Sequence, residues 1–196
     1  RIVARAVKNA LVIADMPFLS FQVSPSETVL NAGRFLKAGA GGVKLEGCRP
    51  IADSIRKLVD LGIPVMGHLG LTPQSVHQLG GYKLQGKDEM AAARMIEDAR
   101  ILEQAGCFAI VLEKIPARLG RSITQAVTLP TIGIGAGPDC DGQILVLNDL
   151  LGIFEDFTPK FVKKYAELGR TVRAAVGQYR SEVKDGKFPD PEHSFE

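Results

Sequence analysis

Charged and imidazole side chains stand at or near the ends of four apolar runs in this sequence. The set is Asp15, Lys44, Glu46, His68 and Glu113. If the runs are parallel strands, their carboxyl ends meet at one edge, which is where α/β proteins bind ligands. Carboxylates, an ammonium group and an imidazole gathered there would suit metal-assisted removal of a proton next to a carbonyl group.

Two carboxylates in this set come from neighbouring runs. Lys44 and Glu46 are two residues apart, so in a strand both side chains face the same side. Lys44 and Glu46 fit a buried structural ion pair as well as a functional pair. For Asp15 alone, the alternative is a carboxylate that caps a turn. Together, Asp15 and Glu46 predict a Mg²⁺ site, because that ion prefers octahedral oxygen ligands and usually takes one or two protein carboxylates.

Glu113 and His68 have different surroundings. Glu113 stands between the apolar residues Leu112 and Ile115, which favours a desolvated proton acceptor. A salt bridge to Lys114 or a nearby arginine is the alternative. His68 lies among small residues, where a neutral imidazole would hydrogen-bond a substrate oxygen, although a satisfied core histidine fits the same pattern.

Composition narrows the classes of function. The 196 residues include 45% hydrophobic residues and carry a net charge of +2, which excludes an electrostatic footprint for nucleic acid or an anionic membrane. Cys48, Cys107 and Cys140 are widely spaced, which argues against disulfides and zinc and favours a cytoplasmic protein. No run approaches the roughly 20 apolar residues of a membrane span. G-x-S-x-G, Walker and H-E-x-x-H motifs are absent, and the glycine-rich segment 133–137 is a weak nucleotide signal.

The alternation of segment types along the chain predicts the strands and helices that would position these residues. Short runs of Val, Ile and Leu alternate with longer amphipathic segments, which is typical of parallel strands joined by crossover helices. Ser24 to Glu27 has the pattern of a capping box, and Gly39, Gly62 and Gly106 are predicted to end three helices. The predicted strands are residues 11–14, 42–45, 64–67, 108–112, 131–134 and 144–147, and the predicted helices are 24–39, 51–62, 88–105, 116–127 and 159–184.

Two architectures fit an α/β protein of this kind, an open doubly wound sheet and a closed TIM barrel. A (βα)8 barrel needs eight strand–helix units and typically about 250 residues, whereas this chain has about six units in 196 residues. Residues 1–8 read as the end of a helix that leads into a strand. A truncated (βα)8 barrel explains both facts, and one domain is expected over residues 1–196.

The sequence closely resembles the ketopantoate hydroxymethyltransferase family of the phosphoenolpyruvate/pyruvate superfamily. The matching blocks follow one another in order over essentially the whole chain, and the block around His68 is very specific. They are ADMPF at 14–18, VKLEG at 43–47, GHLGLTPQS at 67–75, GGYK at 80–83, LE at 112–113, IGIGAG at 132–137 and DGQILV at 141–146.

The resemblance implies a reaction and a role for each site residue. A hydroxymethyl group would pass from 5,10-methylenetetrahydrofolate to 3-methyl-2-oxobutanoate, giving 2-dehydropantoate for pantothenate synthesis through a Mg²⁺-stabilised enolate. Asp15 and Glu46 would bind Mg²⁺, and Asp15, Lys44 and His68 would contact the keto acid. Glu113 would accept the proton from carbon 3. Family members are cytoplasmic and usually form homodecamers, so a homo-oligomer without nucleic-acid or membrane partners is expected.

One departure from the family leaves alternatives open. Family members have two further units before the position of Arg1, with a Gly-Asp-Ser motif that completes the metal site, so residues 1–196 alone are expected to bind Mg²⁺ poorly and to be weakly active or inactive. A 2-oxo acid lyase or mutase of the same superfamily is a second reading, with Cys48 or Cys140 as the acid. A catalytically dead assembly subunit with exposed sheet edges is a third.

Overall fold

The computed structural model describes residues 1–195 of the chain. It divides into two compact units, Arg1–Ile144 and Leu145–Glu196. The first unit contains all the site residues predicted from the sequence. The single domain expected over residues 1–196 stays a prediction.

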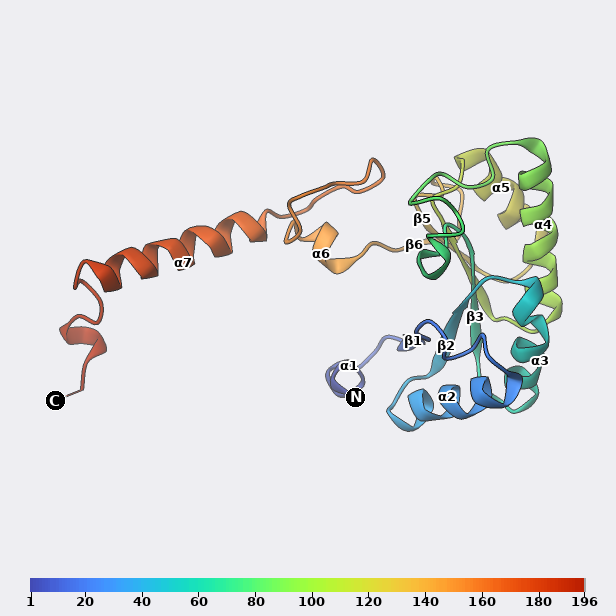
Figure 1. Ribbon diagram of the computed structural model, residues 1–196, viewed down its shortest axis with the longest axis horizontal. Coiled ribbons are helices and arrows are strands. Elements are labelled where there is room, and N and C mark those ends of the chain that lie inside the picture. The colour runs from blue at the N-terminus through green and yellow to red at the C-terminus, as the bar shows by residue number, and fades with distance from the viewer. Residues whose placement is uncertain (196) are drawn as a thin grey trace. The chain divides into compact units, whose positions relative to one another are not determined.

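A parallel sheet forms the centre of the first unit, and its strands follow one another in chain order (Figure 1). Because a doubly wound sheet reverses its strand order part-way, this sequential order excludes that alternative. The sheet curls into half a barrel, which confirms the α/β class. Its strands are β1 (Ile13–Asp15), β2 (Gly42–Glu46), β3 (Val65–Gly70), β4 (Ala109–Glu113), β5 (Thr131–Ile134) and β6 (Gly142–Gln143).

Helices connect the first five strands and lie along one side of the sheet (Figure 1). Their ends follow local chemistry: the Ser24 side chain accepts a hydrogen bond from the Glu27 N–H, and Asp88 caps the next long helix in the same way. After a short α1 (Ile2–Ala6), the helices are α2 (Pro25–Lys37), α3 (Ala52–Asp60), α4 (Glu89–Gln104) and α5 (Ala117–Ala126), with 3₁₀ turns η1 (Arg49–Ile51) and η2 (Pro73–Ser75).

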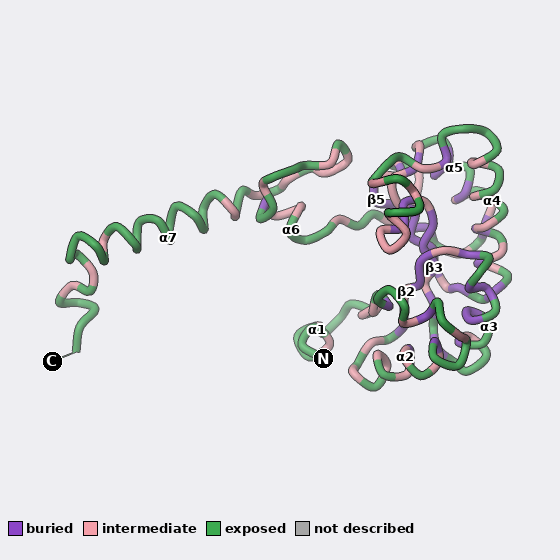
Figure 2. Tube along the Cα trace, in the orientation of Figure 1, coloured by how far each residue is buried: buried purple, intermediate pink, exposed green. Residues whose placement is uncertain are grey.

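The core lies between the strands and these helices, where Figure 2 shows the chain as buried. On the helix-facing side, Leu45 pairs in register with Gly67, and Gly67 pairs with Ile110. A Cβ at Gly67 would lie 2.8 Å from Leu102 Cδ1 of α4, so glycine is what lets this helix pack closely on β3. Leu45, Ile110 and Leu102 are fully buried, and each such side chain stabilises the fold by about 1.5–3 kcal/mol.

The sixth strand differs from the prediction. The apolar residues 144–147 were expected to form it, but pairing ends at Gln143, and Ile144 is 53% exposed. Asp141 accounts for the difference, because its carboxylate accepts hydrogen bonds from the N–H and the hydroxyl group of Thr131 at 2.8 and 3.0 Å. This anchor places the chain beside the start of β5 earlier than the apolar run predicts.

The Asp141 anchor gives a pH-dependent prediction. The Thr131 N–H and hydroxyl group lower the pKa of Asp141, so the stabilisation is complete above the ordinary carboxyl range and is lost as pH falls through the lowered pKa. We expect Asp141→Asn to reduce the free energy of unfolding by less than about 1 kcal/mol at pH 7, because Asp141 is exposed and solvent screens the contact, and by less still near pH 3. Urea unfolding at pH 7 and pH 3 measures this effect, with the exposed Glu192→Gln as control. Equal destabilisation by Asp141→Asn at the two pH values would contradict the prediction.

The second unit contains α6 (Leu147–Leu150), α7 (Leu168–Lys184) and η3 (Pro191–His193). The helix predicted over 159–184 begins only at Leu168. The N–H groups of Tyr165 and Leu168 donate to the carbonyls of Leu150 and Leu151, which occupies donors that a continuous helix would use. α7 has no buried residue (Figure 2). Within residues 1–195, no helix has the length and apolar character needed to cross a membrane.

Candidate active site

Five ionisable side chains share the face of the sheet opposite the helices. Asp15 pairs in register with Lys44, and Glu46 pairs with His68. His68 pairs in turn with Val111, which is two residues before Glu113 on the same strand. Because side chains alternate along a strand, the whole predicted set lies on one face and at one end of the sheet.

Lys44 connects two members of this set. Its Nζ lies 2.7 Å from Asp15 Oδ1 and 3.2 Å from His68 Nδ1. An ammonium group can only donate hydrogen bonds, so Nδ1 must be the acceptor. With Nδ1 as the acceptor of this contact, the ring proton of His68 is on Nε2.

His68 Nε2 lies close to the remaining carboxylate of the set. Nε2 lies 3.2 Å from Glu113 Oε2, yet the alignment is too poor for a hydrogen bond, and Nε2 has no hydrogen-bond partner within residues 1–195. The His68 side chain is only 3% exposed, and a buried donor of this kind is normally paired. A substrate oxygen, or a small rotation of Glu113, would satisfy it.

Glu46 is the most buried carboxylate of the set, with 5% of its side chain exposed. Its Oε2 accepts the Gln74 N–H at 2.9 Å, whereas Oε1 is 3.9 Å from His68 Nδ1. Burial raises the pKa of Glu46, outweighing the Gln74 hydrogen bond and the charge of Lys44, and Asp15 raises it further. A cation beside Glu46 and Asp15 would relieve this cost.

Backbone hydrogen bonds fix the chain where it leaves β1, β2 and β3. The Met16 N–H donates to the Lys44 carbonyl, the Gly47 N–H to the His68 carbonyl, and the Leu71 N–H to the Glu113 carbonyl. Each loop therefore begins in a direction set by the neighbouring strand.

Gly70, the last residue of β3, makes one of these connections possible. Its φ is +92°, and a Cβ there would lie 2.1 Å from the Glu113 carbonyl oxygen. We expect Gly70→Ala to lower the free energy of unfolding by about 3 kcal/mol, from the left-handed backbone and the clash together. Urea denaturation measures this, with Gly33→Ala as control, because a Cβ at Gly33 in α2 meets nothing within 4 Å and should be neutral or stabilising. Equal stability of the two variants would contradict the prediction.

Gln74 is a contact that the sequence did not single out. It stands in η2 within the block at 67–75, and besides the N–H bond to Glu46 its side chain donates to the Met16 carbonyl. The only signals in the sequence are its place six residues after His68 and the preceding Pro73, which favours a tight turn.

Comparison with known proteins decides the family. The family model described as Ketopantoate hydroxymethyltransferase matches residues 1–191. The chain belongs to the ketopantoate hydroxymethyltransferase family. It is 61% identical to the 3-methyl-2-oxobutanoate hydroxymethyltransferase of Syntrophus aciditrophicus (strain SB), over 100% of this chain and 72% of that protein. The enzyme of the same name from Syntrophobacter fumaroxidans (strain DSM 10017 / MPOB) is 60% identical over 98% of this chain and 69% of that protein.

Membership of the ketopantoate hydroxymethyltransferase family confirms the resemblance read from the sequence and the prediction of a hydroxymethyltransferase enzyme. Among solved structures, the phosphoenolpyruvate phosphomutase from Streptomyces platensis subsp. rosaceus matches with a TM-score of 0.55 and 14% identity, covering 98% of this chain and 68% of that one. This likeness concerns the fold alone, and it agrees with the curled parallel sheet.

The cysteines of this ketopantoate hydroxymethyltransferase family member bear on the lyase alternative. Cys48 is buried, and its Sγ–H donates to the Asp98 carbonyl of α4. Burial raises the pKa of Cys48 to about 12, and burial also raises the pKa of Cys140. A lyase acid on a flexible loop must release a proton readily, so neither thiol is suited to that role.

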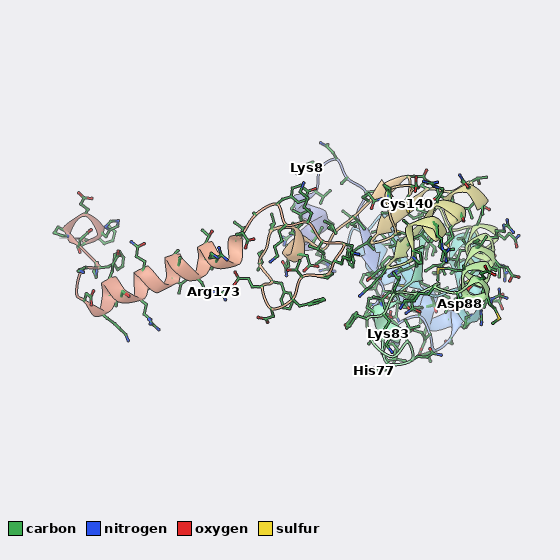
Figure 3. The ribbon with its side chains drawn as sticks, turned by 90° about the horizontal axis from the view of Figure 1, so that it is seen from above. Lys8, His77, Lys83, Asp88, Cys140 and Arg173 are labelled. Atoms are coloured by element: carbon green, nitrogen blue, oxygen red, sulfur yellow. The ribbon has the colours of Figure 1, made fainter. Side chains whose placement is uncertain are left out.

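Other polar side chains lie on the segment between β3 and α4. His77 and Lys83 are both on the loop that follows β3, and Asp88 is at the start of α4 (Figure 3). Within residues 1–195, no group of three or more His, Cys, Asp or Glu side chains is placed to hold a metal ion. The Mg²⁺ site therefore rests on two carboxylates, and the roles of Asp15, Lys44, Glu46, His68 and Glu113 stay predictions.

Proposed function

We propose that this protein transfers a hydroxymethyl group from 5,10-methylenetetrahydrofolate to 3-methyl-2-oxobutanoate, giving 2-dehydropantoate for pantothenate synthesis. The observation that carries the proposal is the connected row of Asp15, Lys44, His68 and Glu113, with Glu46 beside it, on one face of the sheet. The names of the relatives support the choice of keto acid.

The sheet is proposed to be part of a (βα)8 barrel. Its sequential parallel order and its likeness to the phosphomutase support this architecture. The absence of the first two units, the decamer and the cytoplasmic location stay predictions.

Asp15 and Glu46 are proposed to hold Mg²⁺. Carboxylate oxygens suit this hard cation, which keeps several water ligands and needs few from the protein. Burial raises the pKa of Glu46, so a cation bound beside its carboxylate would stabilise the charged form. The charge of Asp15 on the neighbouring strand raises this pKa further. When bound there, Mg²⁺ would polarise the keto oxygen of a 2-oxo acid.

The remaining side chains supply binding and proton transfer. Lys44 is 15% exposed and provides positive charge for an anionic keto acid, while its contacts hold Asp15 and the His68 ring. Glu113, with 17% of its side chain exposed, can accept a proton from carbon 3. His68 presents an N–H beside it, which orients the carboxylate or a substrate oxygen.

The reaction balances without an oxidant. The carbon 3–hydrogen bond breaks, its proton passes to Glu113, and the electron pair forms a new bond to the one-carbon unit. The two bonds from that carbon to the folate nitrogens break, and water supplies the hydroxyl group and one proton. The folate nitrogens take up that proton and the proton held by Glu113, and tetrahydrofolate leaves.

Isotope exchange tests the proposal in two stages. The complete protein is incubated in D₂O with Mg²⁺ and 3-methyl-2-oxobutanoate, and NMR follows loss of the carbon 3 proton; 5,10-methylenetetrahydrofolate is then added and 2-dehydropantoate is measured. We expect exchange in the first stage and product in the second. Exchange no faster than in buffer with Mg²⁺ would overturn the proposal, and cleavage of a longer 2-oxo acid to pyruvate would favour the lyase.

A further inference from the structure

Gln74 contacts the ends of two strands that carry the proposed metal ligands, although it belongs to neither. We propose that Gln74 is a positioning residue that holds Asp15 and Glu46 in the arrangement that binds a divalent cation. This inference rests on the proposed function, because it assigns the metal to those two carboxylates.

The first contact fixes the chain next to Asp15. The Gln74 Nε2 donates to the Met16 carbonyl at 2.8 Å, across 58 positions of sequence. The Met16 N–H donates to the Lys44 carbonyl at 3.0 Å, and Met16 itself is fully buried. Met16 is therefore held on one side by β2 and on the other by Gln74, which restricts the backbone of Asp15 directly before it.

The second contact fixes Glu46. The Gln74 N–H donates to Glu46 Oε2 at 2.9 Å, so one carboxylate oxygen is occupied by the backbone and the other stays available to a cation. The same residue therefore contacts the Glu46 carboxylate and the backbone that follows Asp15. Groups that orient metal ligands in this way commonly change metal affinity by about 10–100-fold when they are removed.

The hydrogen bond with the neighbouring Gln22 identifies which way the Gln74 amide points. Gln22 Nε2 donates to Gln74 Oε1 at 3.1 Å, so the oxygen of the Gln74 amide faces Gln22 and its nitrogen faces the Met16 carbonyl. The reverse orientation would place two oxygens against each other. Gln22 contacts only the outer side of the amide, which makes it a matched control.

The experiment separates the side-chain contact from packing. Gln74→Met keeps the length of the side chain and the backbone bond to Glu46 but removes the donor to Met16. Gln22→Met removes the outer bond and the 3.4 Å hydrogen bond that Gln22 Oε1 accepts from the Phe21 N–H, and it leaves the donor to Met16 in place. Mg²⁺ titration by calorimetry and amide hydrogen exchange are measured on the complete protein and both variants. We expect Gln74→Met to weaken Mg²⁺ binding about tenfold and to speed exchange at residues 16–20 but not in β4, with Gln22→Met within about twofold of wild type.

Each outcome decides a separate point. Unchanged Mg²⁺ affinity in Gln74→Met, or faster exchange throughout the sheet, would overturn the positioning role in favour of none or of a purely structural one. If the wild-type protein bound no Mg²⁺, the metal site of the proposed function would fail. In that case, unchanged amide exchange at residues 16–20 in Gln74→Met would also show that the Gln74 contact does not restrain the end of β1.

Discussion

Glu113→Gln should slow exchange of the carbon 3 proton of 3-methyl-2-oxobutanoate by about 10³-fold, within the range that a positioned general base supplies. The amide has nearly the same shape as the carboxylate, and its oxygen can still face the N–H of His68, 3.2 Å from the present Oε2. It cannot take up a proton. NMR in D₂O with Mg²⁺ and the keto acid measures the rate directly, without the folate.

Two further measurements make the Glu113 result specific. Mg²⁺ affinity should stay within about twofold of wild type, because Glu113 is not one of the two proposed ligands. Glu97→Gln removes an exposed carboxylate on α4 that pairs with Arg49, and it should leave exchange unchanged. Exchange within tenfold of wild type in Glu113→Gln would show that another group takes the proton.

Lys44→Met should lower kcat/KM for the keto acid by about 10²–10³-fold, the range seen when one preorganised donor is removed from an active site. The change removes the ammonium that contacts Asp15 at 2.7 Å and His68 at 3.2 Å. Two carboxylates then share a site without their cation, and His68 Nδ1 loses the donor that fixes its tautomer. Steady-state kinetics gives the ratio, and the ¹⁵N shifts of His68 report the tautomer.

A matched variant controls for loss of a lysine. Lys37→Met removes an exposed lysine at the end of α2 and should leave both kcat/KM and the His68 shifts unaltered. If Lys44→Met kept kcat/KM within tenfold of wild type, the contacts of Lys44 would be only structural.

Local signals in the sequence were enough to predict most of the fold. The cap at Ser24 and the glycines that end three of the helices mark boundaries that depend on neighbouring residues only. The sixth strand and the helix at 159–167 were predicted wrongly, because hydrogen bonds from other segments decide both. Asp141 bonds to Thr131 ten positions away, and the carbonyl of Leu150 takes the Tyr165 N–H.

The sequence predicted on which face of the sheet the site residues lie, but not which of their side chains contact each other. Alternation along a strand places Lys44 and Glu46 on one face, and parallel order brings Asp15 and His68 beside them. Spacing does not say that the Lys44 ammonium stands between Asp15 and His68, because that depends on side-chain rotamers. Gln74 was missed because its contact with Met16 closes a loop of 58 positions.

Alternation along β2, β3 and β4 separates two kinds of mutation. Odd positions of β2, such as Leu45, serve cohesion against the helices, and even positions, such as Lys44, serve chemistry. A new activity could therefore arise by exchanging inward residues while the outward layer keeps its shape. Such a sheet can accept many substitutions at the positions that face the site and still stay folded, which is one physical route to a superfamily of many reactions.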